Sequence, residues 1–181
     1  MTSHGVLQEL LAQAWKNAIT GDYHRQRINS ERSLQASLWS KLNDLLSVEY
    51  RMFIEPRLKA KEGLVKPESR LPDIAICNAE EVVAFLEIKY LPRAKPKWQK
   101  DLKTFEWINR HKDQLKVQNV RYRGVVKDDR LYKISEGVLF VWAGVHASAG
   151  LDLRPYIEPS LSKRFFELHA ETKHGEHPTV R

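Results

Sequence analysis

Cysteine is almost absent from this 181-residue chain, which contains a single residue of that type, Cys77. One cysteine cannot form an internal disulfide, so a hydrophobic core has to stabilise the fold. Cys77 ends the apolar run 74–77, where a thiol is more often a small core residue than a nucleophile. The shortage of cysteine favours a reducing compartment, and we expect a cytoplasmic protein.

Long hydrophobic runs are also missing. No stretch approaches the roughly 18 apolar residues of a membrane-spanning helix, and the N-terminal sequence MTSHGVLQELLAQAW lacks the regions of a signal peptide. The glycines are isolated, which excludes a glycine-rich phosphate-binding loop, and no cysteine–histidine spacing indicates structural zinc. The histidines are scattered, and we expect His169, His174 and His177 to lie in a solvated tail.

Basic residues are in excess. The chain has 30 Lys and Arg residues against 23 Asp and Glu residues, for a formal net charge of +7. Such a charge attracts polyanions, and nucleic acid is the first candidate. A solvated basic surface without a partner would give the same composition, so the charge alone does not decide between them.

The length and composition predict a single α/β domain over residues 1–181, with a core over about 30–145. Apolar residues at helical spacing predict helices, and short β-rich apolar runs predict strands. In chain order, the predicted core elements are a helix at 30–47, strands at 50–58, 72–77 and 82–90, a helix at 96–113 and a strand at 137–145. This αβββαβ order favours a mixed sheet flanked by helices.

Other elements are expected around that core. The pattern predicts an N-terminal helix at 5–20, a strand at 118–126 and a C-terminal helix at 159–170. Residues 59–70 are predicted to be a mobile loop and the polar tail 172–181 to be disordered. Either terminal helix could supply a homodimer interface.

Two carboxylates and one ammonium group are predicted to share a small patch. Asp73 begins one strand, and Glu87 and Lys89 lie two positions apart on the next strand, so their side chains leave the same face. The short turn between the two strands brings Asp73 alongside Glu87 in an antiparallel hairpin. Paired carboxylates bind hard divalent cations such as Mg²⁺, and a neighbouring lysine stays protonated and stabilises developing negative charge.

Glu31 is a further candidate for this patch. It lies in the first turn of the helix at 30–47, where a carboxylate interacts favourably with the helix dipole. It also continues the stripe of Leu34, Leu38 and Leu42 toward the N-terminus, and a carboxylate on a buried stripe needs a cation or donors. We expect Glu31 to join the metal site, although a first-turn role alone would explain it.

The combination of Pro72-Asp73, Glu87-Ile88-Lys89 and a preceding helix that carries Glu31 resembles the PD-(D/E)XK nuclease superfamily, which has a restriction-endonuclease-like fold. The resemblance covers about residues 30–145 and implies the same αβββαβ core. It implies that Asp73, Glu87 and the carbonyl of Ile88 hold the metal, with Glu31 in support, and that Lys89 is catalytic. It also implies that Gln35 helps to orient water or phosphate.

The acidic-x-Lys triplet alone is weak evidence, because it occurs three times in this chain. Only Glu87–Lys89 falls on a predicted strand after an apolar run. Asp101–Lys103 lies within a predicted helix and Glu171–Lys173 at the edge of the predicted tail. The neighbouring Pro-Asp and the order of elements therefore carry the prediction.

Clusters of cations with polar or aromatic neighbours are the expected nucleic-acid contacts. The favoured cluster follows the candidate catalytic strand and consists of Lys95, Lys97, Gln99, Lys100 and Lys103. Another comprises Arg121, Arg123, Lys127 and Arg130, interleaved with Tyr122 and Tyr132, and aromatic rings beside cations can stack on unpaired bases.

The sequence thus predicts a nuclease that hydrolyses phosphodiester bonds with Mg²⁺, or Mn²⁺ in its place, as cofactor. A DNA endonuclease is the favoured form. Two alternatives stay open: a module on the same fold that binds nucleic acid or protein without cutting, and a nuclease for RNA or branched DNA.

Overall fold

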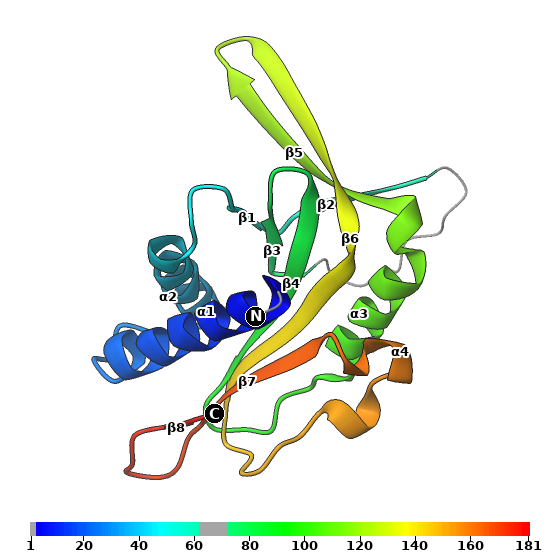
Figure 1. Cartoon of the computed structure of the whole chain (residues 1–181). Coiled ribbons are helices and arrows are strands. Elements are labelled where there is room, and N and C mark those ends of the chain that lie inside the picture. Colours follow the sequence, from blue (N-terminus) through cyan, green and yellow to red (C-terminus); the bar gives the residue numbers. More distant parts are fainter. Residues whose placement is uncertain (1–2, 62–71) are drawn as a thin grey trace.

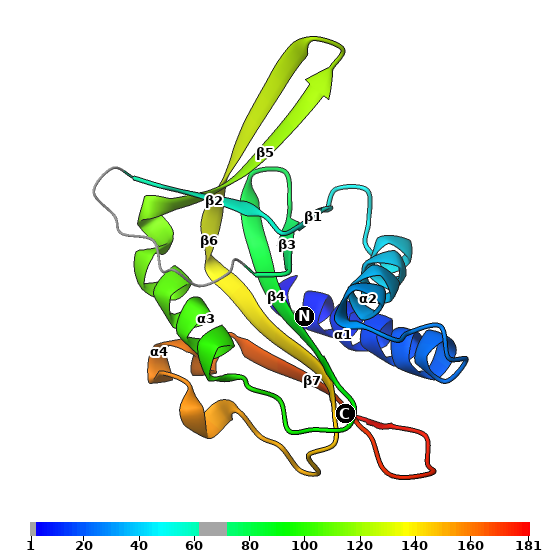
Figure 2. The ribbon, with the colours of Figure 1, turned by 180° about the vertical axis from the view of Figure 1, so that it is seen from behind.

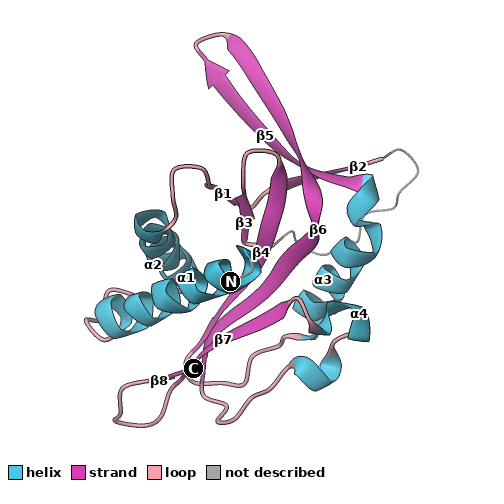
Figure 3. Ribbon diagram, in the orientation of Figure 1, coloured by secondary structure: helices cyan, strands magenta, loops and turns pink. Residues whose placement is uncertain are grey.

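A mixed sheet of eight strands forms the centre of the computed structural model, which describes residues 3–61 and 72–181. Helices cover both faces of this sheet (Figures 1 and 3). The strand order is β1-β3-β4-β6-β5-β2, with β7 paired to β6 and β8 paired to β7. The expected α/β class with a mixed sheet flanked by helices is confirmed.

The helical elements agree with the predicted ones at the N-terminal end and in the middle of the chain. They are α1 (Ser3–Asn17), a π-helical turn (Ala18–Tyr23), α2 (Glu31–Leu45), α3 (Gln99–His111), α4 (Pro159–Ser162) and 3₁₀ turns at Lys112–Gln114 and Arg154–Tyr156. None of the helices within the described residues is long and apolar enough to cross a membrane.

The strands follow the predicted order with additions on both sides of the core. They are β1 (Arg51–Ile54), β2 (Arg57–Ala60), β3 (Ile74–Cys77), β4 (Glu81–Leu91), β5 (Leu115–Arg123), β6 (Val126–His146), β7 (Phe165–Glu171) and β8 (Thr179–Val180). β3 and β4 form the expected antiparallel hairpin, whereas β4, β6 and β7 run parallel to one another. The crossover from β4 through α3 allows β6 to return in the parallel direction.

One hydrophobic layer lies between the sheet and the helices α1 and α2 (Figure 2). The predicted leucine stripe of α2 is buried at Leu34, Leu38 and Leu42, and α1 contributes Leu11 and Trp15. Ser30 caps α2 by accepting a hydrogen bond from the backbone N–H of Ser33. This cap fixes where α2 begins and therefore where Glu31 lies.

The opposite layer lies between the sheet and α3. Leu102, Phe105 and Ile108 of α3 are buried against Phe85 and Phe140 of the central strands. Because β4 is buried on both faces, both rows of its alternating side chains meet a hydrophobic layer. Polar side chains on this strand are therefore enclosed.

A register shift between Val82 and Ala84 changes the face of the first β4 residues. Ala84, Leu86 and Ile88 face the α1–α2 layer, but Val82 faces α3. A bulge of this kind inserts a residue and reverses the alternation before it. Glu87 and Lys89 lie beyond the shift, so their predicted common face is retained.

The hairpin of β5 and the first part of β6 extends beyond the rest of the sheet (Figure 1). β2 pairs with β5 only as far as Gln118, and β4 pairs with β6 only from Lys133 onward. We call the projecting residues 119–131 the arm. Its tip is a two-residue loop that begins at Gly124, which has a φ of +60° that glycine adopts without strain.

The prediction of a helix at 159–170 is wrong. Only Pro159–Ser162 is helical, and Phe165–Glu171 forms strand β7. β7 pairs with β6 on one side and β8 on the other, and the buried residues Leu168, His169 and Ala170 are consecutive. A strand buried on both faces loses the alternation that distinguishes it from a helix.

The predicted disorder of the tail 172–181 is also wrong. Thr179–Val180 forms β8, and the backbone of Arg181 exchanges two hydrogen bonds with that of His169. The expected strand at 50–58 is divided at Glu55, which has a φ of +48°, and the chain resumes as β2. Residues 62–70 of the loop predicted at 59–70 lie outside the described residues, whereas Lys59 and Ala60 belong to β2.

Gly144 offers a test of how tightly β6 is packed. A Cβ atom added there would lie 2.3 Å from Cη2 of the Trp142 indole. We expect Gly144→Ala to lower the free energy of unfolding by about 1–3 kcal/mol, because neither the strand nor the buried ring can move freely. Urea denaturation measures the change.

Gly21→Ala is the matched control, because a Cβ at Gly21 meets nothing within 4 Å. In that helical turn, alanine should leave stability unchanged or raise it by up to about 1 kcal/mol. Equal stability of Gly144→Ala and the wild type would contradict the packing described for Trp142.

Candidate active site

The candidate site lies at the N-terminal end of strand β3, beyond which β4 continues without this neighbour. Ile74 is the first residue of β3 and pairs with Leu86, so the edge of β4 beyond Leu86 has no antiparallel neighbour. The side chain of Asp73 replaces the missing strand, because its Oδ2 accepts the backbone N–H of Ile88 at 2.6 Å. Asp73 is therefore held beside β4, as the predicted hairpin requires.

The side chains of Glu87 and Lys89 are together on the α3 side of β4. Lys89 Nζ lies 2.7 Å from Glu87 Oε1 and 3.3 Å from Asp101 Oδ1. Glu87 and Asp101 are buried, with 8% and 5% of their surfaces exposed. The ammonium group of Lys89 thus bridges two carboxylates from different elements.

Asp101, in the first turn of α3, is a member of this site that the sequence prediction left out. Its second oxygen, Oδ2, accepts the indole N–H of Trp142 at 3.2 Å. Trp142 is paired in register with Glu87 on the neighbouring strand β6, and its ring lies over Gly144. A helix, a strand and a glycine therefore combine to fix the position of Asp101.

Helix α2 contributes two side chains to the open edge of β4. Glu31 Oε2 accepts the backbone N–H of Tyr90 at 3.4 Å, and Gln35 Nε2 donates to the backbone carbonyl of Asp73 at 3.1 Å. The structure therefore brings both predicted residues to the site. The expectation that Glu31 continues a buried stripe is wrong, because Glu31 is exposed.

Burial and mutual repulsion make the carboxylates of this site weak acids. Burial, together with the charge of Asp73, raises the pKa of Glu87 to about 8. Burial, together with the charges of Glu31 and Asp101, raises the pKa of Asp73 to about 6, against the opposing hydrogen bond from Ile88. Burial opposes the charge of Lys89, but Glu87 and Asp101 outweigh it and raise the pKa of the ammonium group. Lys89 is therefore a cation, unsuited to act as a base.

The donor set fits a hard divalent cation. Asp73 and Glu87 repel each other in a buried patch, and a bound cation would remove that repulsion. Within residues 3–61 and 72–181, no three Asp, Glu, His or Cys side chains are already gathered as metal ligands. A metal would therefore combine the two carboxylates with a backbone carbonyl and water, which is common for Mg²⁺.

Ile88 can supply that carbonyl. In a strand, the N–H and C=O of one residue point to the same neighbour, as in the hydrogen-bonded pairs of an antiparallel ladder. The N–H of Ile88 points to Asp73, so its carbonyl faces the same open edge. The side chain of Ile88 is fully buried in the α1–α2 layer, which fixes the backbone there.

The predicted basic contacts follow β4 on the surface. Lys95, Lys97, Gln99, Lys100 and Lys103 are all exposed. On a helix, each residue is rotated by about 100° from the previous one, so Gln99 and Lys103 point away from the face that carries Asp101. Lys95 and Lys97 precede α3 and stay the candidates for contacts beside the site.

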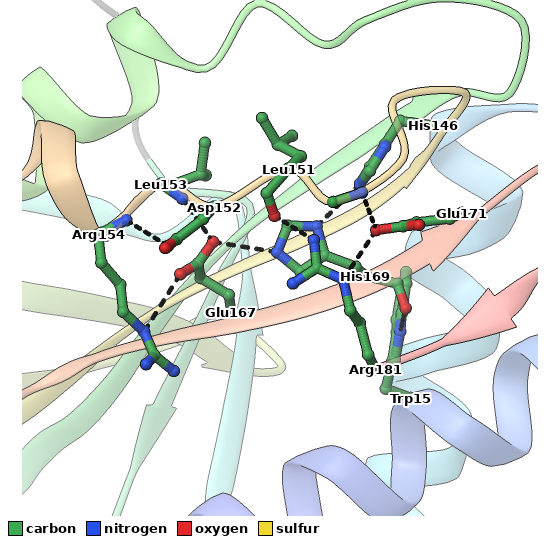
Figure 4. A network of polar contacts seen from close by, with 11 residues as sticks. Trp15, His146, Leu151, Asp152, Leu153, Arg154, Glu167, His169, Glu171 and Arg181 are labelled. Atoms are coloured by element: carbon green, nitrogen blue, oxygen red, sulfur yellow. Dashed lines mark hydrogen bonds and ion pairs between the residues drawn. The ribbon is translucent and has the colours of Figure 1, made fainter.

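A second buried polar network lies on the same face of the sheet (Figure 4). His146 Nε2 lies 2.8 Å from His169 Nδ1, and His169 Nε2 lies 3.0 Å from Glu167 Oε2. Glu171 accepts hydrogen bonds from the N–H of Gly150 at 3.0 Å and from Arg181 Nε at 2.8 Å. These contacts attach the last residues of the chain to β6 and β7.

The histidine pair is structural, and His146 is neutral near pH 7. His146 and His169 are 0% and 1% exposed, and burial together with His169 lowers the pKa of His146 to about 4. The indole of Trp142 lies against both rings, at centroid distances of 6.0 and 5.4 Å. The network therefore supports the residue that holds Asp101, and the placement of His169 in a solvated tail is wrong.

No family model, curated protein or solved structure matches the chain.

The raised pKa values predict how cation binding depends on pH. Protons and a divalent cation compete for Asp73 and Glu87, whose pKa values are about 6 and about 8. The affinity for Mn²⁺ should therefore rise more than about tenfold from pH 6.5 to pH 8.5, because Glu87 becomes ionised over this range. Isothermal titration calorimetry at the two pH values measures it.

Glu87→Gln should weaken binding and remove most of this pH dependence, because the amide does not titrate. Glu136→Gln, at an exposed carboxylate, is the control and should bind as the wild type does. An affinity that is the same at both pH values, or no binding at millimolar Mn²⁺, would contradict a metal role for the pair.

Proposed function

We propose that the chain is a metal-dependent nuclease that hydrolyses phosphodiester bonds, with DNA as its preferred substrate. One observation carries the proposal: Asp73, Glu87 and Lys89 lie in one patch at the open edge of β4, with Ile88 between the last two. The elements of the α2–β1–β3–β4–α3–β6 series support it, because they follow the order of the restriction-endonuclease-like core that the sequence resembles.

Each side chain has a definable part in such a reaction. A bound Mg²⁺ would neutralise phosphoryl oxygens and lower the pKa of a water molecule. Asp73, Glu87 and the carbonyl of Ile88 would hold the ion, and Glu31 would contribute from α2. Lys89 would place its ammonium charge beside the attacked phosphate as negative charge develops. In hydrolysis, a water oxygen forms the new bond to phosphorus and the ester oxygen leaves.

Gln35 and Asp101 would keep this arrangement in place. Gln35 donates a hydrogen bond to the backbone carbonyl of Asp73, and the buried Asp101 forms an ion pair with Lys89. Lys89 has two carboxylate partners, so its charge stays compensated when Glu87 engages another cation. Such support keeps a catalytic group within the small positional range that catalysis requires.

The second candidate function is binding of nucleic acid or protein without cleavage. One observation favours it: Lys89 already forms ion pairs with Glu87 and Asp101, so a protein group engages Glu87 without a metal. A module of this kind would bind no divalent cation at the carboxylate pair. RNA or branched DNA as substrate is distinguished from linear DNA by a substrate panel, since the site chemistry is the same.

Cleavage of plasmid and single-stranded DNA, with Mg²⁺, with Mn²⁺ and with EDTA, tests the proposal. We expect cleavage that EDTA abolishes, and Lys89→Ala should lower the rate by about 10²–10³-fold because it removes charge stabilisation in the transition state. Asp73→Ala should have an effect at least as large, since it removes a metal ligand. Gel assays of product formation give the rates.

Lys163→Ala is the matched control, because it removes an exposed lysine at the end of α4. The control should cleave at the wild-type rate. Cleavage that persists in Lys89→Ala or Asp73→Ala at the rate of the control would overturn the site assignment. Absence of cleavage on every substrate, with no calorimetric binding of Mn²⁺, would leave the binding module as the function.

A further inference from the structure

A cavity of about 590 Å³ lies between α2, the junction of β1 and β2, and the base of the arm. Three aromatic residues are among those that line it, Trp39, Phe53 and Tyr122, and the ring of Phe53 also packs against Tyr132 of the α3 layer. The ring of Tyr122 is 66% exposed although it belongs to the lining. An open cavity with several aromatic walls can accept a flat ring by stacking.

Polar groups lie beside those rings. Arg57, Gln118 and Asn119 also line the cavity, and they offer guanidinium and amide groups. Within the described part of the chain, no carboxylate forms an ion pair with Arg57. Amides can both donate and accept hydrogen bonds, as the edges of nucleobases require. The cavity therefore combines stacking surfaces with hydrogen-bonding groups of both kinds.

The sheet face that continues from the cavity is basic. Leu58 and Val117 point into the α3 layer, so their neighbours on β2 and β5 point the other way. We call this exposed surface the basic face, and its cations are Arg57, Lys59, Lys116, Lys127 and Lys133. Two carboxylates, Asp129 and Glu81, lie in register on the same face, which leaves a net positive charge.

One residue of the cavity lining contacts the candidate active site. Glu55 lines the cavity, and its backbone N–H donates to the carbonyl of Asp73 at 2.9 Å. On α2, Glu31, Gln35 and Trp39 follow each other at intervals of four, so they lie along one face of the helix. The rise of about 1.5 Å per residue places Trp39 about 12 Å along α2 from Glu31. A bound chain could therefore contact both places.

We infer that the cavity binds a nucleobase of an unpaired nucleic-acid strand, whose phosphates lie on the basic face. The inference rests on the proposed function, since it names the part of the substrate that flanks the cleaved bond. A positively charged surface with accessible aromatic rings is the arrangement that single-strand binding requires. A duplex keeps its bases stacked inside, so it offers no free ring to Trp39 and Tyr122.

Fluorescence anisotropy with a labelled 12-nucleotide oligo(dT) tests the inference, in EDTA so that no hydrolysis occurs. Tyr122→Ala should weaken binding about fivefold or more, because one base loses its stacking partner, whereas Tyr122→Phe should retain the wild-type affinity. A 12-base-pair duplex should bind Tyr122→Ala and wild type equally. Arg57→Ala should reduce the slope of log affinity against log salt by about 0.7.

Tyr156→Ala is the matched control, because Tyr156 is 59% exposed and packs against Trp98, outside the cavity lining and the basic face. Equal affinity of Tyr122→Ala and Tyr156→Ala for the oligonucleotide, or equal loss of duplex binding, would overturn the inference. If binding depends on Tyr122 but no cleavage occurs in Mg²⁺, the inferred nucleobase site is supported and the proposed nuclease activity is rejected. If the protein cleaves the substrate but binding does not depend on Tyr122, the nuclease activity is supported and the nucleobase site is rejected.

Discussion

The ammonium group of Lys89 lies between two buried carboxylates, and several surrounding residues hold it in that position. Glu87 and Asp101 would be costly to bury as unpaired anions, and Lys89 would be costly to bury alone. Their geometry depends on α3, which brings Asp101 over the sheet, and on Trp142, which fixes its second oxygen. Gly144 makes room for that indole, and the histidine pair also lies against it.

The same residues also complete the backbone of the fold. β3 is shorter than β4, which leaves donors of β4 unpaired at the edge of the sheet, and Asp73 and Glu31 accept the N–H groups of Ile88 and Tyr90. Buried backbone donors without a partner are unfavourable, so these carboxylates have a structural role even without a ligand. The same side chains serve the proposed chemistry and the stability of the fold at this edge, so a substitution here affects both.

The part of the site that could be predicted from the sequence is the part fixed by local periodicity. Glu87 and Lys89 share a face because strands alternate, and Glu31 and Gln35 approach β4 because α2 has a regular leucine stripe. Asp101 was assigned only to a helix, because its contact with Lys89 depends on how α3 crosses the sheet. The prediction of a helix at 159–170 was wrong for a related reason. β7 lies between β6 and β8, and its burial on both faces removed the alternation that marks a strand. His146 and His169 come together only through that pairing of strands.

The molecule therefore has two charged regions, the carboxylate site and the basic face. The carboxylate site has more anions than cations, and its one lysine has two acceptors, so Glu87 could engage a cation without leaving Lys89 unpaired. The basic face has cations in excess and lies on the exposed side of the strands that form the arm. In the inferred complex, a polyanion on the basic face would reach the cavity, whose lining residue Glu55 donates a backbone hydrogen bond to Asp73. Phosphates and carboxylates repel each other, so a phosphate chain approaches the carboxylate patch favourably only where a cation lies between them. The proposal of an unpaired strand as ligand therefore requires a divalent ion at the site.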